Sequence, residues 1–134
     1  MSRFVTLFFV AIGALIFSIS TTGCKKETPP PNPFFTQWDT PYGFPPFDKI
    51  RPEHYKPAIE RGIALHSAEI DSIIANTQTP DFNNVIAALD RSGELLDRTY
   101  SIFGQIVATD GNDELRQIEL EIAPKVTAHY DSIY

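Results

Sequence analysis

Residues 82–108 read FNNVIAALDRSGELLDRTYSIFGQIVA, and this stretch decides the fold class. Apolar side chains recur every three or four residues along it, which is the spacing of one face of an α-helix. This stripe consists of Phe82, Val85, Ile86, Leu89, Leu96, Tyr100, Phe103, Ile106 and Val107. Asp81 before the stretch is a preferred N-cap residue. Gly111 after it is expected to supply a left-handed helix end. We therefore expect one helix over about residues 82–108.

Two further helices are expected on either side of this stretch, over about residues 53–76 and 113–134. Their apolar stripes are Ile59, Ile63, His66, Ile70 and Ile73 with Ile74 in the first, and Leu115, Ile118, Ile122, Val126, His129 and Ile133 in the second. Gly62 is a mild weakness of the first helix. Asn112 caps the other helix, and Pro124 is expected to kink it. Strand-like alternation is absent, so the prediction is an all-α fold of long antiparallel helices.

The segment before the helices combines proline with aromatic residues. Residues 24–33 contain consecutive prolines, which favour an extended spacer, and we interpret them as a tether. Residues 34–47 then carry Phe34, Phe35, Trp38, Tyr42, Phe44 and Phe47. Because aromatic rings bury large areas, we expect an extended strap whose rings pack onto the rest of the protein. A ligand-binding aromatic patch is the alternative.

The first 24 residues have the pattern of a bacterial export signal. Arg3 supplies a positive charge, and residues 4–19 are almost wholly apolar. Gly23-Cys24 at the end of this stretch resembles a lipobox, although Thr21 stands where leucine is more usual. We predict a lipoprotein signal peptide over residues 1–23 and a lipidated Cys24 that anchors the protein to a membrane of the cell envelope. An uncleaved membrane helix and simple secretion are the alternatives.

Size and composition exclude several classes of function. The chain has 134 residues, enough for one domain at most, and a net charge of −6. Nucleic-acid binding needs a clustered basic face, so we expect no nucleic-acid partner. The single cysteine excludes an intramolecular disulfide framework and a cysteine-rich zinc site.

Three groups of polar residues were weighed as chemical sites. Adjacent Glu53 and His54 point to different sides of a helix and form no dyad. His66 and His129 both fall on apolar stripes. Two such histidines could meet in the core and bind zinc, but a third ligand with suitable spacing is missing, and the favoured interpretation is buried or half-buried histidines that are hydrogen-bonded locally. Residues 110–121 match a calcium loop only weakly, because leucine occupies the sixth position. We therefore predict no catalytic residue and no metal ligand, and leave substrate-binding residues unassigned.

Several long strings carry a resemblance to a known family. Residues 44–60, FPPFDKIRPEHYKPAIE, resemble the N-terminal region of bacterial zinc oligopeptidases. This is the family of peptidyl-dipeptidase, oligopeptidase A and thimet oligopeptidase. The resemblance continues through residues 85–97 (VIAALDRSGELLD), 112–115 (NDEL) and 121–125 (EIAPK). It extends over roughly residues 32–134.

The resemblance implies a large helical, two-lobed peptidase that binds zinc through an H-E-x-x-H helix and a further glutamate in its C-terminal part. These 134 residues do not contain H-E-x-x-H, so no catalytic residue carries over. Zinc and short peptides, cleaved to release C-terminal dipeptides, are expected only for the full-length relative. We interpret residues 34–134 as the N-terminal helical part of such a metallopeptidase, truncated and inactive alone. The alternative is a complete small lipoprotein module that binds a partner without catalysis.

Overall fold

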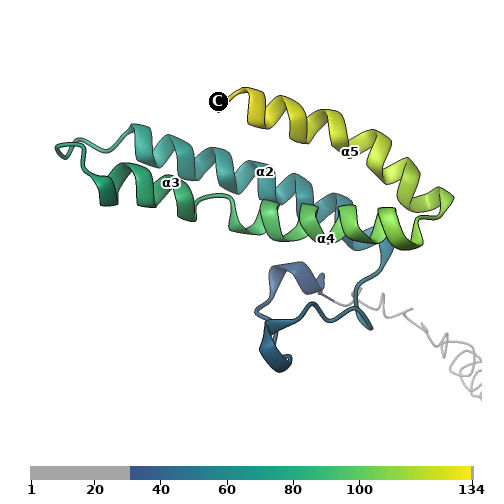
Figure 1. Ribbon diagram of the computed structural model, residues 1–134. Helices are drawn as coiled ribbons and strands as arrows, with labels where there is room; N and C mark the ends of the chain where they lie inside the picture. The colour runs from purple at the N-terminus through teal and green to yellow at the C-terminus, as the bar shows by residue number, and fades with distance from the viewer. Residues whose placement is uncertain (1–30, 134) are drawn as a thin grey trace, which may run out of the picture. The chain divides into compact units, whose positions relative to one another are not determined.

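Helices make up most of residues 31–133, the part of the chain that the computed structural model describes (Figure 1). The α-helices are α2 (Pro52–Ile74), α3 (Ala87–Arg91), α4 (Glu94–Asp110) and α5 (Asp113–Asp131). A π-helical turn, η3 (Phe82–Ile86), precedes α3, and two 3-10 turns, η1 (Pro33–Phe35) and η2 (Pro41–Gly43), lie in the strap. These described residues contain no strand, which confirms the all-α prediction. The predicted signal peptide and Cys24 lie outside them.

The longest helix, α2, is the element against which α4 and α5 pack. It approaches α4 closely at Gly62, where a Cβ atom would lie 2.8 Å from the Cα atom of Leu96. Gly62 is therefore required by close packing, and the prediction that it is only a mild weakness was wrong. Beside it, Ile59 and Leu96 are both fully buried.

The core lies between these three helices and the start of the strap. Its buried apolar residues are Phe34, Tyr55, Ala58, Ile59, Leu96, Phe103, Leu115, Ile122 and Val126. The ring of Tyr55 lies at the centre, with its centroid 5.1 Å from that of Phe103 and 5.5 Å from that of Phe34. The strap is thereby joined to helices α2 and α4 through aromatic contacts.

The helix expected over residues 82–108 is interrupted, which corrects its predicted bounds. It divides into η3, α3 and α4, with the break at Ser92 and Gly93. Gly93 has φ of 78°, a left-handed conformation that glycine adopts without strain. At the other end, Gly111 has φ of −66°, so the predicted left-handed cap does not form there. The predicted N-cap of Asp81 does form, since its Oδ1 accepts from the backbone N–H groups of Asn83 and Asn84.

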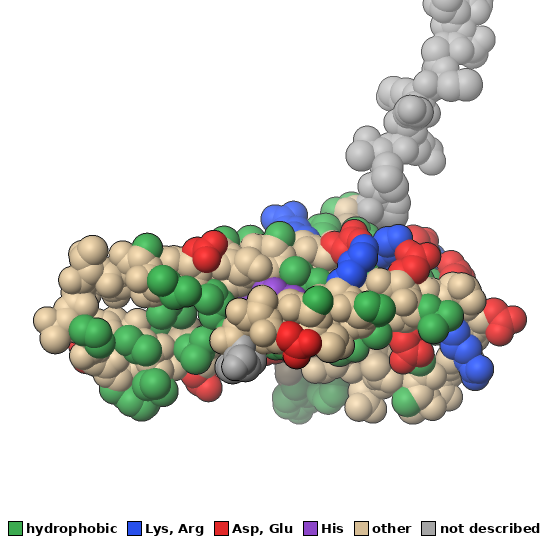
Figure 2. All heavy atoms as spheres, turned by 90° about the horizontal axis from the view of Figure 1, so that it is seen from above, with side chains coloured by type: hydrophobic (Ala, Val, Ile, Leu, Met, Phe, Trp, Pro, Cys, Tyr) green, Lys and Arg blue, Asp and Glu red, His purple; other side chains and the backbone are tan. Residues whose placement is uncertain are grey.

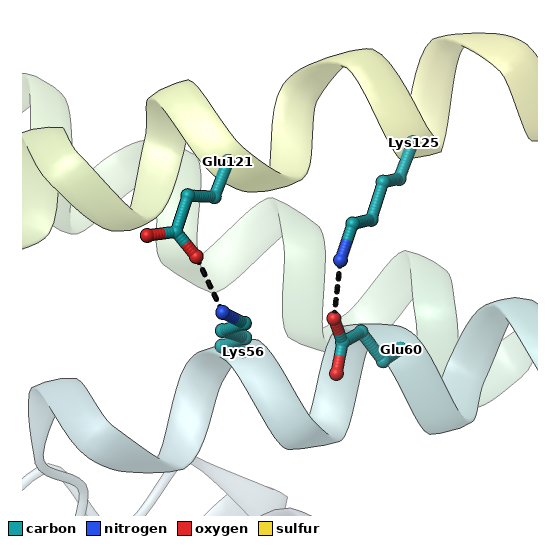
Figure 3. A network of polar contacts seen from close by, with 4 residues as sticks. All are labelled: Lys56, Glu60, Glu121 and Lys125. Atoms are coloured by element: carbon teal, nitrogen blue, oxygen red, sulfur yellow. Dashed lines mark hydrogen bonds and ion pairs between the residues drawn. The ribbon is translucent and has the colours of Figure 1, made fainter.

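Two ion pairs join α5 to α2 on the surface (Figure 3). Lys56 donates to Glu121, and Lys125 Nζ donates to Glu60 Oε1 at 2.5 Å. The hydrogen bond and charge of Lys56 lower the pKa of Glu121, and Glu121 raises the pKa of Lys56. Residue numbers increase together along the two helices, so α5 runs in the same direction as α2. The helix α5 continues through Pro124 without a break.

In the first half of the strap, Phe34 and Trp38 pack as predicted, whereas Phe35 is 40% exposed. Phe34 is fully buried, and the ring centroid of Trp38 lies 6.1 Å from its own. Arg98 of α4 fixes both residues: its Nη2 donates to the Phe34 carbonyl at 3.0 Å, and its guanidinium lies 4.5 Å from the Trp38 ring centroid. This arrangement combines a hydrogen bond with a cation–π contact.

The three aromatic rings in the second half of the strap are mostly exposed, which corrects the prediction for these rings. Tyr42, Phe44 and Phe47 are 98%, 63% and 53% exposed. Figure 1 shows the segment around η2 projecting from the helices, and the hydroxyl of Thr40 closes this turn by donating to the Phe44 carbonyl. Tyr42 has φ of 60°, in the left-handed region that favours glycine.

Candidate functional site

Two buried histidines, His66 of α2 and His129 of α5, form the centre of the main polar cluster. They are 4% and 7% exposed, and Nε2 of His129 lies 3.0 Å from Nδ1 of His66. On the far side of each ring is a serine hydroxyl: Ser92 Oγ lies 3.2 Å from His66 Nε2, and Ser67 Oγ lies 3.4 Å from His129 Nδ1. The favoured interpretation, buried histidines with local hydrogen bonds, is confirmed, and the two rings also contact each other.

The direction of these hydrogen bonds follows from the backbone carbonyl of Leu89, which can only accept. The Ser92 hydroxyl donates to this carbonyl at 2.7 Å, so its oxygen accepts from His66 Nε2–H. In a neutral His66 ring that donates from Nε2, Nδ1 is the acceptor, and it faces Nε2 of His129 as the donor. His129 Nδ1 in turn accepts from the Ser67 hydroxyl. The network ends on the Leu89 carbonyl, beside the break between α3 and α4.

Burial favours the neutral form of His129. Desolvation of the ring lowers the pKa of His129, and the neighbouring His66 lowers it further. Acidic groups lie close by on other elements: Tyr130 donates to Asp97 Oδ1 at 2.6 Å, and Glu69 Oε2 accepts from the Gly93 N–H at 2.7 Å. A hollow of about 370 Å³ opens beside the histidines. It is lined by His66, Ile86, Leu89, Asp90, Ser92, Asp97 and Tyr130.

The cluster does not provide a catalytic arrangement. The Ser92 hydroxyl is committed to the Leu89 carbonyl, and the Gly93 N–H, which could otherwise stabilise an oxyanion, is committed to Glu69. Zinc does not fit either, because the facing nitrogens of His66 and His129 bond each other and residues 31–133 hold no group of three histidine, cysteine, aspartate or glutamate residues placed to bind a metal. The network joins three helices, and its role is structural.

The remaining candidates have structural partners. His54 Nδ1 accepts from the backbone N–H of Arg51 at 3.0 Å, so it caps α2 and makes no dyad with Glu53. Glu121, the twelfth residue of the weak calcium match, is bound to Lys56. The predicted lipidation residue, Cys24, is not among the described residues. Within the described range, no helix has the length and apolar character needed to cross a membrane.

The contacts of Ser67, Ser92 and Arg98 were not predicted from the sequence. The dipeptide Ser92-Gly93 within an apolar stripe was the available signal for a helix break that exposes Ser92 to a partner, since serine and glycine commonly interrupt helices. The partnership of Arg98 with Phe34 and Trp38 gave no sequence signal, because these residues lie at least 60 positions apart along the chain.

Comparison with known proteins identifies the class to which this helical chain is related: the dipeptidyl carboxypeptidases and, more distantly, oligopeptidase A. The chain is 43% identical over 103 residues to dipeptidyl carboxypeptidase of Escherichia coli, and 37% identical to that of Salmonella typhimurium. Oligopeptidase A of Salmonella typhimurium is 24% identical over 90 residues. No family model matches the chain.

These matches cover most of this chain but a small part of the relatives. The aligned residues make up 77% of this chain and 15% of each dipeptidyl carboxypeptidase. The chain therefore corresponds to a segment of these much longer proteins, which confirms the family resemblance found in the sequence.

Proposed function

We propose that residues 34–134 are the N-terminal helical part of a dipeptidyl carboxypeptidase-like metallopeptidase and do not themselves contain its catalytic centre. The observation that carries this proposal is the match to dipeptidyl carboxypeptidase of Escherichia coli. The match is 43% identical over 77% of this chain, but it covers only 15% of that relative. Identity at this level over 103 residues favours a shared fold for the segment.

The contacts of the described residues support a structural role for this segment. The polar network around the two buried histidines uses its hydroxyls, imidazoles and the Gly93 N–H to join α2 and α5 to the break between α3 and α4. These groups have internal partners, which leaves them unsuited to binding a substrate. The segment would therefore supply a helical wall to the whole enzyme.

For the whole protein, we propose release of dipeptides from the C-terminal end of short peptides. The relatives' name, dipeptidyl carboxypeptidase, and the family resemblance of residues 44–60 support this activity. Zinc would be held by residues outside these 134, since the described ones do not fit it. We further propose that Cys24 carries the lipid anchor that holds the enzyme in the cell envelope, on the basis of the apolar stretch and lone cysteine.

The test compares the whole protein encoded by the gene with a chain of residues 24–134. Both are incubated with an N-blocked tetrapeptide, with and without a zinc chelator, and the products are identified by mass spectrometry. We expect the whole protein to release the C-terminal dipeptide, the chelator to abolish this release, and the short chain to be inactive. Zinc-dependent hydrolysis by the short chain, or no dipeptide release by the whole protein, would contradict the proposal.

A further inference from the structure

Apolar side chains are exposed at one end of the helices, where α2 ends and η3 and α3 begin. Ile74, Phe82 and Ile86 are 76%, 70% and 54% exposed. Figure 2 shows hydrophobic side chains gathered at this end of the described part, on the left of the view. We call these three residues the apolar end. Large apolar side chains that gather on one exposed surface are typical of an interaction site.

The register between α2 and α5 shows why this end is uncovered. The ion pairs Lys56–Glu121 and Glu60–Lys125 each join positions 65 apart, and the bonded histidines are 63 apart. The last residue of α5 is Asp131. With a separation of 63 to 65 positions, Asp131 lies beside residues 66–68 of α2. The last turns of α2, through Ile74, extend past α5 and have none of its residues beside them.

We propose that the apolar end is the docking surface for polypeptide that follows residue 134 in the whole protein. This inference rests on the proposed function, which makes the chain a segment of a longer peptidase. Two observations favour this occupant over a second copy or another protein. First, α5 points toward the uncovered last turns of α2, so chain that continues beyond α5 would reach them. Second, the matched residues make up only 15% of each dipeptidyl carboxypeptidase, so most of each relative lies outside the matched segment.

The experiment places a photo-crosslinking amino acid, p-benzoylphenylalanine, at position 82 of the whole protein, with position 74 as a second site. Position 120 is the matched control, because Leu120 of α5 is 69% exposed and Phe82 is 70% exposed. After irradiation, crosslinked peptides are identified by mass spectrometry. We expect crosslinks from positions 82 and 74 to residues beyond 134 of the same molecule, at a yield at least several-fold above that of position 120.

Three results would overturn the inference: crosslinks to a second copy, crosslinks to another protein, or a yield no higher than at position 120. The same protein sample is assayed for dipeptide release, which separates this inference from the proposed function. Active enzyme without the expected crosslinks means that only the docking surface is wrong. A gene that encodes nothing beyond residue 134 means that the proposed function is wrong as well.

Discussion

Nε2 of His129 donates to Nδ1 of His66 across 3.0 Å in the buried space between α5 and α2. The two residues are 63 positions apart, so this bond forms only when both helices are packed. With Ser67 and Ser92 it makes a chain of hydrogen bonds that runs in one direction and ends on the carbonyl of Leu89. A proton added to His129 would place a positive charge in this buried space, and because desolvation disfavours that charge the packing of α5 is sensitive to acid.

The first prediction is a loss of stability in mild acid. Because burial lowers the pKa of His129 in the folded chain below its ordinary value of 6.5, the unfolded chain binds the proton more tightly. This contribution to stability is therefore complete above pH 6.5 and is lost as the pH falls below it. We expect the midpoint of thermal unfolding, followed by circular dichroism, to decrease from pH 7 to pH 5.

The variant His129→Gln isolates the cause, since the glutamine amide can still donate to His66 but does not titrate. This variant is expected to lose much of the decrease between pH 7 and pH 5. His54→Gln is the matched control, because His54 only caps α2 and glutamine can accept the same bond. An unchanged pH dependence in His129→Gln would show that the histidine pair is not responsible.

The second prediction concerns the contact between α2 and α4. Gly62→Ala places a Cβ atom 2.8 Å from the Leu96 Cα atom, and a backbone atom has no easy way to move aside. We expect a loss of about 1–3 kcal/mol in the free energy of unfolding, measured with urea. Gly104→Ala in α4 is the control: an added Cβ meets nothing within 4 Å there, and alanine should stabilise the helix by up to about 1 kcal/mol. Equal effects of the two substitutions would refute the close packing.

The third prediction uses the surface ion pairs to test the register of α2 and α5. Lys56→Glu places two carboxylates together at the position of Glu121 and should lower the unfolding midpoint. Combining it with Glu121→Lys restores an attractive pair, so the double variant should recover most of the loss. Both ion pairs are solvent-exposed, so the effects should be small and should shrink at high salt. Failure of the second substitution to compensate would mean that these residues are not paired.

The fourth prediction concerns the proposed anchor. Cys24→Ala should abolish labelling with a radioactive fatty acid and move the protein from the membrane fraction to the soluble fraction, because Cys24 is the single cysteine of these 134 residues and ends the apolar stretch. Thr21→Leu is the control, since it brings the signal closer to the usual lipobox and should retain or increase labelling. Labelling that persists in Cys24→Ala would rule out the lipid attachment at this residue.

Most of the fold was predictable because it depends on local patterns. The stripes of α2 and α5 and the caps at Asp81 and Asn112 are set by residues within a few positions of each other. The break at Ser92-Gly93 was missed, because the apolar stripe continues on both sides of it. What stabilises the break is His66, which lies 26 residues away from Ser92 in sequence.

The candidate site was predictable only in outline. Two histidines on apolar stripes indicated a meeting in the core, but the serines and the direction of the bonds depend on how the helices pack. The strap shows the same limit: nothing local distinguishes the buried Phe34 from the exposed Tyr42 and Phe44. The difference comes from Arg98 and Tyr55, which hold one half of the strap against the helices.

The most direct test of the central claim is the nucleotide sequence of the gene beyond codon 134. The account predicts that the reading frame continues for several hundred codons and encodes an H-E-x-x-H motif, which would supply the zinc site of a peptidase. A stop codon directly after codon 134 would contradict the claim that this helical chain is part of a peptidase.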